Sequence, residues 1–329
     1  MVQFGYKLAA EAFGPVELVR QAQRAEDAGF DFVEISDHYH PWFEAQGHSP
    51  FAWSVLGSIA QATSRIGLAT GVTCPSIRYH PAIIAQAAAT VALLSDGRFT
   101  LGVGAGERLN EHIVGNGYPS VSQRHDMLEE ALTIIRALWK GGYQSYEGRY
   151  LRLEDARVFD LPEVAPDIVV AASGPSSAQV AAEHGDGLFA VEPDAELVED
   201  YRARGGSGPT YGEAGLAWAA TADAALEAAW STARWSLTGW KVMSELPNPV
   251  NFEAASAYIR HEDVAEQLSA GPDLDAHVEA VRPYVDAGFD RIALMNLGPD
   301  PDGFFDAFES DLGDRLRRLS PANTAGTGD

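Results

Sequence analysis

The chain has 329 residues, 46% of them hydrophobic, and a formal net charge of −24. This length suits one large α/β barrel or two ordinary domains, and the hydrophobic content is sufficient for a substantial core. The acidic balance argues against nucleic acid as a partner, because a phosphate backbone requires a basic surface.

The sequence favours a cytoplasmic protein without a membrane span. It contains no run of about 18 apolar residues, the length that a transmembrane helix needs. The N-terminal segment MVQFGYKLAA lacks the basic region and apolar stretch of a signal peptide. The single cysteine, Cys74, leaves no internal disulfide and is typical of a reducing compartment.

Strand and helix patterns alternate along the chain. Apolar, β-favouring runs predict eight strands, at residues 2–7, 30–35, 66–72, 99–103, 167–172, 187–191, 213–220 and 291–296. Helical spacing predicts helices at residues 15–28, 51–63, 81–94, 124–140, 176–184, 195–204, 222–233, 274–287 and 304–319. Eight strands separated by helices are typical of an α/β fold, the (β/α)8 TIM barrel, so we expect a single barrel domain over residues 1–319.

Two segments interrupt this alternation and predict insertions into the barrel. Residues 143–160 alternate polar and apolar side chains around Gly148, which is typical of a β-hairpin. Residues 235–261 contain tryptophans and prolines and indicate a long excursion of the kind that often forms a lid or a substrate-binding loop. The small, polar residues 320–329 predict a disordered tail.

Reactive side chains are expected where barrel strands end, because the C-terminal ends of parallel strands meet at one rim. The most informative stretch is 31–51, in which a buried strand gives way abruptly to acidic, histidine and tryptophan side chains. The candidates near strand ends are Glu11, Asp37, His38, Trp42, Thr73, Cys74, Glu107, Asn110, Ser173, Gly174, Ser176 and Ser177. Such a set of residues indicates an enzyme.

His38 is the candidate proton-transfer group, because an imidazole titrates near neutral pH. The alternative is a structural loop histidine bonded to Asp37. The neighbouring His40 and His48 raise the question of a metal, but the spacing matches no common zinc pattern, so no metal site is predicted.

Glu107 lies in a glycine-rich turn, where the backbone can approach a ligand closely. The alternative is an acid favoured by the N-terminus of a helix. The turn resembles the dinucleotide fingerprint GxGxxG, but Glu107 replaces the last glycine and the turn lies in the middle of the chain. A Rossmann site is therefore not predicted.

Other candidates have binding rather than reacting side chains. Residues 173–178, SGPSSA, open a predicted helix; their N–H groups and hydroxyls either cradle a phosphate or simply cap the helix. Cys74 has no evident base beside it, so packing against a ligand is favoured over a nucleophilic role. Trp42 and Trp240 lie in polar or loop-like contexts and are predicted to form pocket walls.

Several segments resemble the luciferase-like superfamily of barrels, and most of all its F420-dependent branch of glucose-6-phosphate dehydrogenases and secondary alcohol dehydrogenases. The similar segments are GYKLAAEAFGP, VEISDHYHPW, GHSPFAW, SIRYHPAIIAQAAAT, LGVGAGERLNE, AASGPSSAQVAAEHGDG and FESDLGDRLRRL. The motifs SDH…PW and GxGExLNE together are specific to this branch. The resemblance implies coenzyme F420, a deazaflavin, and hydride transfer at its C5 atom.

The resemblance also implies roles in catalysis. His38 would remove the hydroxyl proton of the substrate, and Glu107 would serve the N1 side of the deazaflavin. Trp42 would pack beside the reacting centre, and Glu11 matches an acid in the pocket of the alcohol dehydrogenases.

Another group of residues is implied to contact the coenzyme. Its members are Asp37, Gly71, Val72, Thr73, Cys74, Asn110, Ser173, Gly174, Ser176 and Ser177. Those at the predicted helix start would hold the coenzyme phosphate. The Gly71–Val72 bond matches the position of a non-proline cis peptide that shapes the ring pocket, and Cys74 stands where a threonine is usual.

The chain departs from the sugar-phosphate enzymes where they bind the substrate phosphate. Val191 and Asp194 replace a threonine and a lysine past strand six, and an acid near Glu266 replaces a further lysine. An acidic rim would repel a sugar phosphate unless Lys241 or Arg260 substitutes. Glucose 6-phosphate is therefore disfavoured as the substrate.

These observations predict a homodimeric, F420-dependent oxidoreductase. Its substrate would be an alcohol, a sugar-like hydroxyl compound or the matching carbonyl. The alternatives are an FMN-dependent monooxygenase of the same superfamily and a non-catalytic barrel that binds the deazaflavin.

Overall fold

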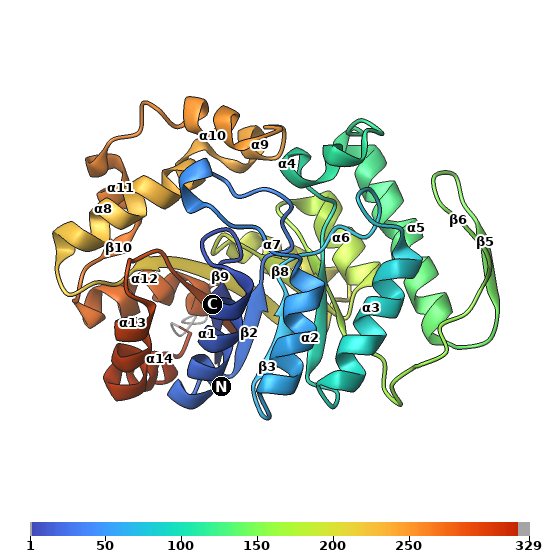
Figure 1. The fold of residues 1–329 in the computed structure, drawn as a ribbon, viewed down its shortest axis with the longest axis horizontal. Helices are drawn as coiled ribbons and strands as arrows, with labels where there is room; N and C mark the ends of the chain where they lie inside the picture. The colour runs from blue at the N-terminus through green and yellow to red at the C-terminus, as the bar shows by residue number, and fades with distance from the viewer. Residues whose placement is uncertain (1, 322–329) are drawn as a thin grey trace, which may run out of the picture.

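Eight parallel strands close into a barrel in a computed structural model that describes residues 2–321. They follow one another around the ring, and β11 pairs with both β9 and β1 to close it (Figure 1). The strands are β1 (Gln3–Leu8), β2 (Phe32–Ile35), β3 (Gly67–Thr70), β4 (Phe99–Val103), β7 (Ile168–Ala171), β8 (Gly187–Ala190), β9 (Thr210–Ala217) and β11 (Arg291–Asn296). The predicted (β/α)8 barrel is confirmed, while the predicted tail lies outside the described residues from 322 onward.

Amphipathic helices cover the outside of the barrel. They are α1 (Pro15–Ala28), α2 (Ala52–Ala62), α3 (Pro81–Leu94), α5 (Val121–Trp139), α6 (Pro175–His184), α7 (Ala195–Ala203), α8 (Ala222–Ala233) and α12 (Leu274–Asp286). Helix α1 shows why its bounds were predicted correctly: Pro15 occupies its first turn, and Gly29 ends it with a φ of 87°. Within residues 2–321, no helix combines the length and apolar character needed to cross a membrane.

The C-terminal helix differs from its prediction, which was one helix over residues 304–319. It starts at Pro301, because the side chain of Asp300 accepts a hydrogen bond from the Gly303 N–H and caps the first turn. It then passes through a π-helical turn. The segments are α13 (Pro301–Ala307), η4 (Phe308–Leu312) and α14 (Gly313–Arg317).

Side chains inside the barrel form layers. One layer is apolar and consists of Phe32, Val169, Phe189, Tyr211 and Ala293. The next layer lies two residues nearer the C-terminal ends of the strands. There Glu34 of β2 and Glu213 of β9 form ion pairs with Lys7 of β1. Strand β9 begins at Thr210, three residues earlier than predicted. The turn-forming sequence GGSGP ends at residue 209, so the strand can start directly after it.

The insertion after α5 is the predicted hairpin, in which β5 (Gln144–Glu147) pairs antiparallel with β6 (Arg152–Ala156). The second insertion contains short helices that the sequence did not reveal individually. They are η3 (Arg234–Thr238), α9 (Trp240–Met243), α10 (Pro249–Ala255) and α11 (His261–Gln267), followed by β10 (Ser269–Ala270). Its apolar residues pack on Trp42 and Phe43, so the insertion covers the loop that follows β2 (Figure 1).

Candidate active site

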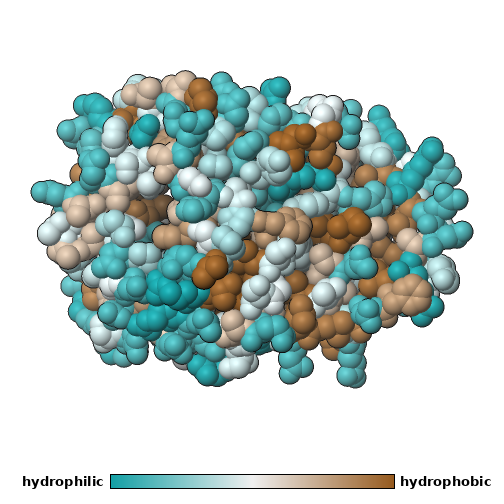
Figure 2. All heavy atoms as spheres, in the orientation of Figure 1, coloured by the Kyte–Doolittle hydropathy of each residue, from teal (hydrophilic) through white to brown (hydrophobic). Residues whose placement is uncertain are grey.

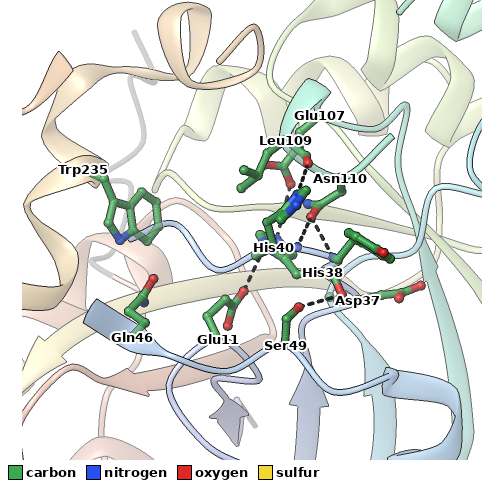
Figure 3. A network of polar contacts seen from close by, with 12 residues as sticks. Glu11, Asp37, His38, His40, Gln46, Ser49, Glu107, Leu109, Asn110 and Trp235 are labelled. Carbon is green, nitrogen blue, oxygen red and sulfur yellow. Dashed lines mark hydrogen bonds and ion pairs between the residues drawn. The ribbon is translucent and has the colours of Figure 1, made fainter. Parts of the chain in front are cut away.

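His38 lies between two carboxylates at the barrel rim (Figure 3). It follows β2, while Glu11 follows β1 and Glu107 follows β4. Its Nδ1 lies 3.2 Å from a Glu11 carboxylate oxygen, and its Nε2 lies 3.6 Å from a Glu107 carboxylate oxygen. The barrel therefore brings together three residues that the sequence reading selected for catalysis.

The two acids decide the protonation of His38. Burial alone lowers the pKa of the imidazole, but Glu11 and Glu107 more than offset this and raise the pKa of His38 to about 9. The ring therefore carries a positive charge at neutral pH in the free protein. Such a group donates a proton readily and becomes a base only as the pH rises toward its pKa.

Asp37 makes its side-chain contacts with the loop after β3. One carboxylate oxygen accepts a hydrogen bond from the Thr73 hydroxyl at 2.7 Å. The other accepts from the Tyr79 hydroxyl at 3.0 Å and from the Arg78 guanidinium at 3.1 Å. These contacts replace the bond from Asp37 to His38 that a purely structural histidine was expected to make.

Arg78 and Glu111 extend this network and were not predicted. The Arg78 main-chain N–H donates to a Glu111 carboxylate oxygen at 2.8 Å, and burial raises the pKa of Glu111 to about 7. A signal for Glu111 was present in the sequence. It lies four residues after Glu107, a spacing that places both on one face of a helix.

Helix α4 (Arg108–Glu111) is tied to the His38 loop by Asn110. The Asn110 side-chain oxygen accepts from the main-chain N–H groups of Tyr39, at 2.8 Å, and His40, at 3.3 Å. Glu107 is the N-cap residue of this helix, but its side chain makes no capping hydrogen bond. The alternative of an acid favoured by the N-terminus of a helix therefore stays open.

Glu107 also supplies an observation that favours a bound ligand. Its oxygen Oε2 is buried and has no hydrogen-bond partner among the described residues. An unpaired buried carboxylate oxygen is costly unless a ligand satisfies it. The site therefore fits a ligand that presents a hydrogen-bond donor beside Glu107, as the N–H groups of a reduced deazaflavin ring do.

An aromatic wall lies beside His38. The Trp42 ring meets the His38 ring edge-on at a centroid distance of 4.7 Å, and it stacks on Trp235 at 4.1 Å. Phe252 closes the wall with its centroid 5.1 Å from that of Trp42. Trp240, predicted as a pocket wall, is instead 44% exposed, because the apolar side of the insertion faces Trp42 through Trp235.

The segment Gly71–Cys74 follows β3 and carries four of the predicted coenzyme contacts. The Gly71–Val72 peptide bond is cis, as predicted. Thr73 and Cys74 are buried, and burial raises the pKa of the Cys74 thiol, which keeps it in the unreactive protonated form. A Cβ on Gly106 would lie 2.8 Å from the Cys74 sulfur, so the glycine-rich turn packs directly against this segment.

The first turn of α6 presents the predicted phosphate-binding residues. The Ser177 hydroxyl accepts a hydrogen bond from the Ser173 N–H at 3.1 Å and donates to the Gly174 carbonyl at 3.0 Å. Ser173 and Ser176 are exposed, and Pro175 occupies the first turn. The Ser177 hydroxyl is used within the turn, whereas the Ser176 side chain is exposed to solvent. The start of α6 therefore fits an anion.

The positions that differ from the sugar-phosphate enzymes hold no cation. Val191 is 46% exposed after β8, and the Asp194 carboxylate caps α7 by accepting from the Leu197 N–H at 3.1 Å. Glu266 is exposed on α11. Arg260 pairs with Asp263 at 2.7 Å, which reduces its value as a substitute cation.

A family model described as luciferase-like monooxygenase matches residues 2–294. The chain belongs to this family. The luciferase-like resemblance of the sequence motifs is therefore confirmed, and the match extends over nearly all of the barrel.

Relatives within the luciferase-like family include several F420-dependent enzymes. The F420-dependent hydroxymycolic acid dehydrogenase of Mycobacterium tuberculosis is 40% identical over 291 residues, covering 86% of this chain and 80% of that protein. The F420-dependent glucose-6-phosphate dehydrogenase of Nocardia farcinica is 36% identical over 334 residues, covering 97% and 99%. A solved F420-dependent secondary alcohol dehydrogenase in complex with an F420–acetone adduct has a TM-score of 0.89 at 28% identity, covering 96% and 99%.

Proposed function

We propose that this chain is an F420-dependent oxidoreductase acting on an alcohol or the matching carbonyl compound. The observation that carries the proposal is His38 held between Glu11 and Glu107 at the rim of a luciferase-like barrel. The relatives named as F420-dependent dehydrogenases support the choice of coenzyme. When bound, the deazaflavin exchanges a hydride with a substrate carbon at C5.

The residues around this centre exchange the substrate proton, stabilise charge and position the His38 loop. His38 exchanges the hydroxyl proton of the substrate, while Glu11 holds its ring in place and stabilises the positive charge. The buried oxygen of Glu107 that has no partner among the described residues would accept a hydrogen bond from the N1 side of the coenzyme ring. Asp37 and Asn110 fix the loop on which His38 lies.

The coenzyme contacts proposed elsewhere follow the same rim. The segment Gly71–Cys74 would contact the coenzyme ring, and the first turn of α6 would hold its phosphate through Ser173, Gly174, Ser176 and Ser177. Strand β4, which carries Glu107, pairs with β7, which leads into α6. Ring and phosphate contacts thus come from neighbouring strands.

The protonation of His38 sets how each direction of the reaction depends on pH. A protonated imidazole donates to the oxygen of a carbonyl in reduction, whereas oxidation of an alcohol requires the neutral ring. With a pKa of about 9, His38 is in the form that reduction requires at pH 7 and reaches the form that oxidation requires in more alkaline solution.

The aromatic wall favours an uncharged, partly apolar substrate. Trp42 lies beside His38 and is backed by Trp235 and by the fully buried Phe252, while Glu11 and Glu107 contribute negative charge. A phosphorylated sugar would meet repulsion there, while a secondary alcohol with an apolar chain would pack on the rings. We therefore propose such alcohols, and the matching ketones, ahead of glucose 6-phosphate.

Coenzyme binding tests the proposal directly. Titration of F420 with the protein should quench its fluorescence, and a tenfold excess of FMN should not relieve the quenching. Tight binding of FMN without binding of F420 would instead identify a flavin-dependent monooxygenase. A screen of secondary alcohols, ketones, aldehydes and sugar phosphates against oxidised and reduced F420, read by coenzyme absorbance, then identifies the substrate class. Binding of F420 without turnover of any of them would favour the non-catalytic alternative.

We also propose a homodimer, formed through the outer face of α2 and α3. Helix α3, PAIIAQAAATVALL, is apolar apart from Gln86 and Thr90, and Ile83, Leu93 and Leu94 remain exposed on it, with Phe51 at the start of α2. Figure 2 shows hydrophobic residues gathered on the part of the surface where Figure 1 places these helices. An apolar face of this kind is typical of an interface between subunits.

Light scattering measures the state of assembly. The wild-type mass should be about twice the 35.3 kDa of one chain, and Ile83→Glu should shift it toward one chain. A monomeric wild type would exclude the dimer.

A cytoplasmic location is proposed because Cys74 is a free thiol, and cell fractionation tests it.

A further inference from the structure

A charged cluster lies inside the barrel below the active site. Lys7, Glu34 and Glu213 come from β1, β2 and β9, and their side chains are 5%, 1% and 12% exposed. They form the layer between the apolar barrel interior and the rim. A lysine and two glutamates in this position are unusual, because buried charges are retained only when each is closely paired.

The Lys7 ammonium uses all three of its donors. Its Nζ lies 2.8 Å from a Glu34 carboxylate oxygen and 2.7 Å from the main-chain oxygen of Gly71, and it also pairs with Glu213. A lysine has three N–H groups, so its capacity is filled. The two glutamates therefore hold the ammonium against a single backbone carbonyl.

Gly71 is shaped to receive this contact. A Cβ at this position would lie 2.1 Å from a Glu34 carboxylate oxygen, so any larger residue would push the backbone away from the cluster. The carbonyl of Gly71 thus approaches Lys7 because position 71 has no side chain.

The same segment leads directly to the active site. Two residues after Gly71, the Thr73 hydroxyl donates to Asp37, which precedes His38. The main chain of Thr73 is bonded on both sides, with its N–H donating to the Gly102 carbonyl and its carbonyl accepting from the Gly104 N–H. Beyond Gly71 the segment is held by the β4 turn. At its beginning the Gly71 N–H donates to the Ile35 carbonyl at 2.9 Å, and Lys7 holds the Gly71 carbonyl.

We propose that Lys7 is a positioning residue, whose ammonium, held by Glu34 and Glu213, fixes the Gly71 carbonyl and thereby the segment Gly71–Cys74 on which the coenzyme ring rests. The proposal rests on the function proposed above, since it takes F420 as the ligand. It assigns the cluster to the coenzyme site, although none of the three side chains touches the coenzyme. Loss of the ammonium would therefore weaken coenzyme binding and change the environment of the ring.

The test removes the charge of the whole cluster. In the triple variant Lys7→Met, Glu34→Gln, Glu213→Gln, side chains of similar size remain and no buried charge is left unpaired. We expect its dissociation constant for F420 to rise about tenfold, as for the loss of one charge-assisted hydrogen bond. The visible circular dichroism of bound F420 should also change, because the ring no longer has a fixed floor.

Glu213→Gln divides the effect between the two glutamates. It removes one of the two carboxylates that hold Lys7 but leaves Glu34 and the Gly71 carbonyl bonded to it, so the dissociation constant should rise by less than in the triple variant. The single variant Lys7→Arg gives a second measurement that does not depend on folding of the triple variant. It keeps a positive charge for both glutamates, but the larger, planar guanidinium cannot take the place of the compact ammonium at the Gly71 carbonyl. It should also weaken F420 binding and change the dichroism.

The outcomes separate this proposal from the function on which it rests. If the folded triple variant or Lys7→Arg binds F420 with wild-type affinity and dichroism, the cluster only fills the barrel and the proposal is wrong. If the wild type itself does not bind F420, the proposed function fails before the variants are compared.

Discussion

Two arcs of the barrel rim differ in how their polar residues are held. On the arc after β1 to β4, Glu11, Asp37, His38 and Asn110 are all less than 10% exposed. On the arc after β7 and β8, the turn opening α6 is mostly exposed and bonds within itself. Buried polar groups that bond one another keep one geometry, so the first arc is suited to chemistry and the second to binding.

This difference predicts different consequences of mutation. Changes on the first arc should affect the chemical step or its pH dependence. Changes on the second arc, and on the insertion above the rim, should affect binding of coenzyme or substrate. Single substitutions on each arc test whether chemistry and binding are separated in this way.

Replacement of His38 by alanine should have the largest effect. Proton transfer by a positioned side chain contributes about 10²- to 10⁴-fold, so kcat/KM should fall by that factor while F420 binding remains within a few-fold. Steady-state kinetics and fluorescence titration measure the two quantities. His48→Ala is the matched control, because this exposed histidine of the same loop bonds Glu11 through its main chain alone. Equal turnover by both variants would remove His38 from the mechanism.

Glu11→Gln should move the pH dependence of the reaction. The Glu11 and Glu107 carboxylates together raise the pKa of His38 to about 9 against the effect of burial, so removal of the Glu11 charge lowers that pKa. Alcohol oxidation requires the neutral imidazole, so its inflection, near pH 9 in the wild type, should move toward neutral pH. Oxidation at pH 7 should gain up to about tenfold, the factor for one unit of pKa.

The pH profile of kcat/KM, recorded in both directions, measures this shift. Carbonyl reduction should show the opposite trend and lose activity at a lower pH than the wild type does. An unchanged inflection in Glu11→Gln would mean that another group controls the profile.

Trp235→Ala tests whether the insertion contributes to the substrate wall. Loss of its stack on Trp42 should raise the substrate KM about fivefold, with little change in F420 affinity. Trp240→Ala is the matched control, since Trp240 lies in the same insertion but is largely exposed. If the two variants have the same KM, the wall does not contact the substrate.

The same division explains how much the sequence could predict. Strand ends and turn glycines place residues along the chain, so the positions of His38, Glu107 and the α6 turn followed from pattern and topology. The partners of these residues depend on which side chains meet across the barrel. Glu34 lies in a hydrophobic strand, but only the proximity of Lys7 explains how its charge is buried.

The helices follow the same rule. The bounds of α1 and α8 were predicted because proline, glycine and capping threonine mark them locally. The short helices of the insertion lack a regular apolar face of their own and form against Trp42 and Phe43. Trp235 was therefore not singled out as the residue that stacks on Trp42, while Trp240, chosen from its loop-like context, is 44% exposed.

Ser176→Ala should have the smallest effect and completes the comparison. Its hydroxyl faces solvent at the start of α6, so its loss should raise the dissociation constant for F420 about threefold, as for one neutral hydrogen bond. The value of kcat at saturating F420 should not change, because the phosphate lies away from the reacting centre. Ser310→Ala, an exposed serine on η4, is the control and should leave both quantities unchanged. A lower kcat for Ser176→Ala would contradict the division, because it would link the second arc to the geometry around His38.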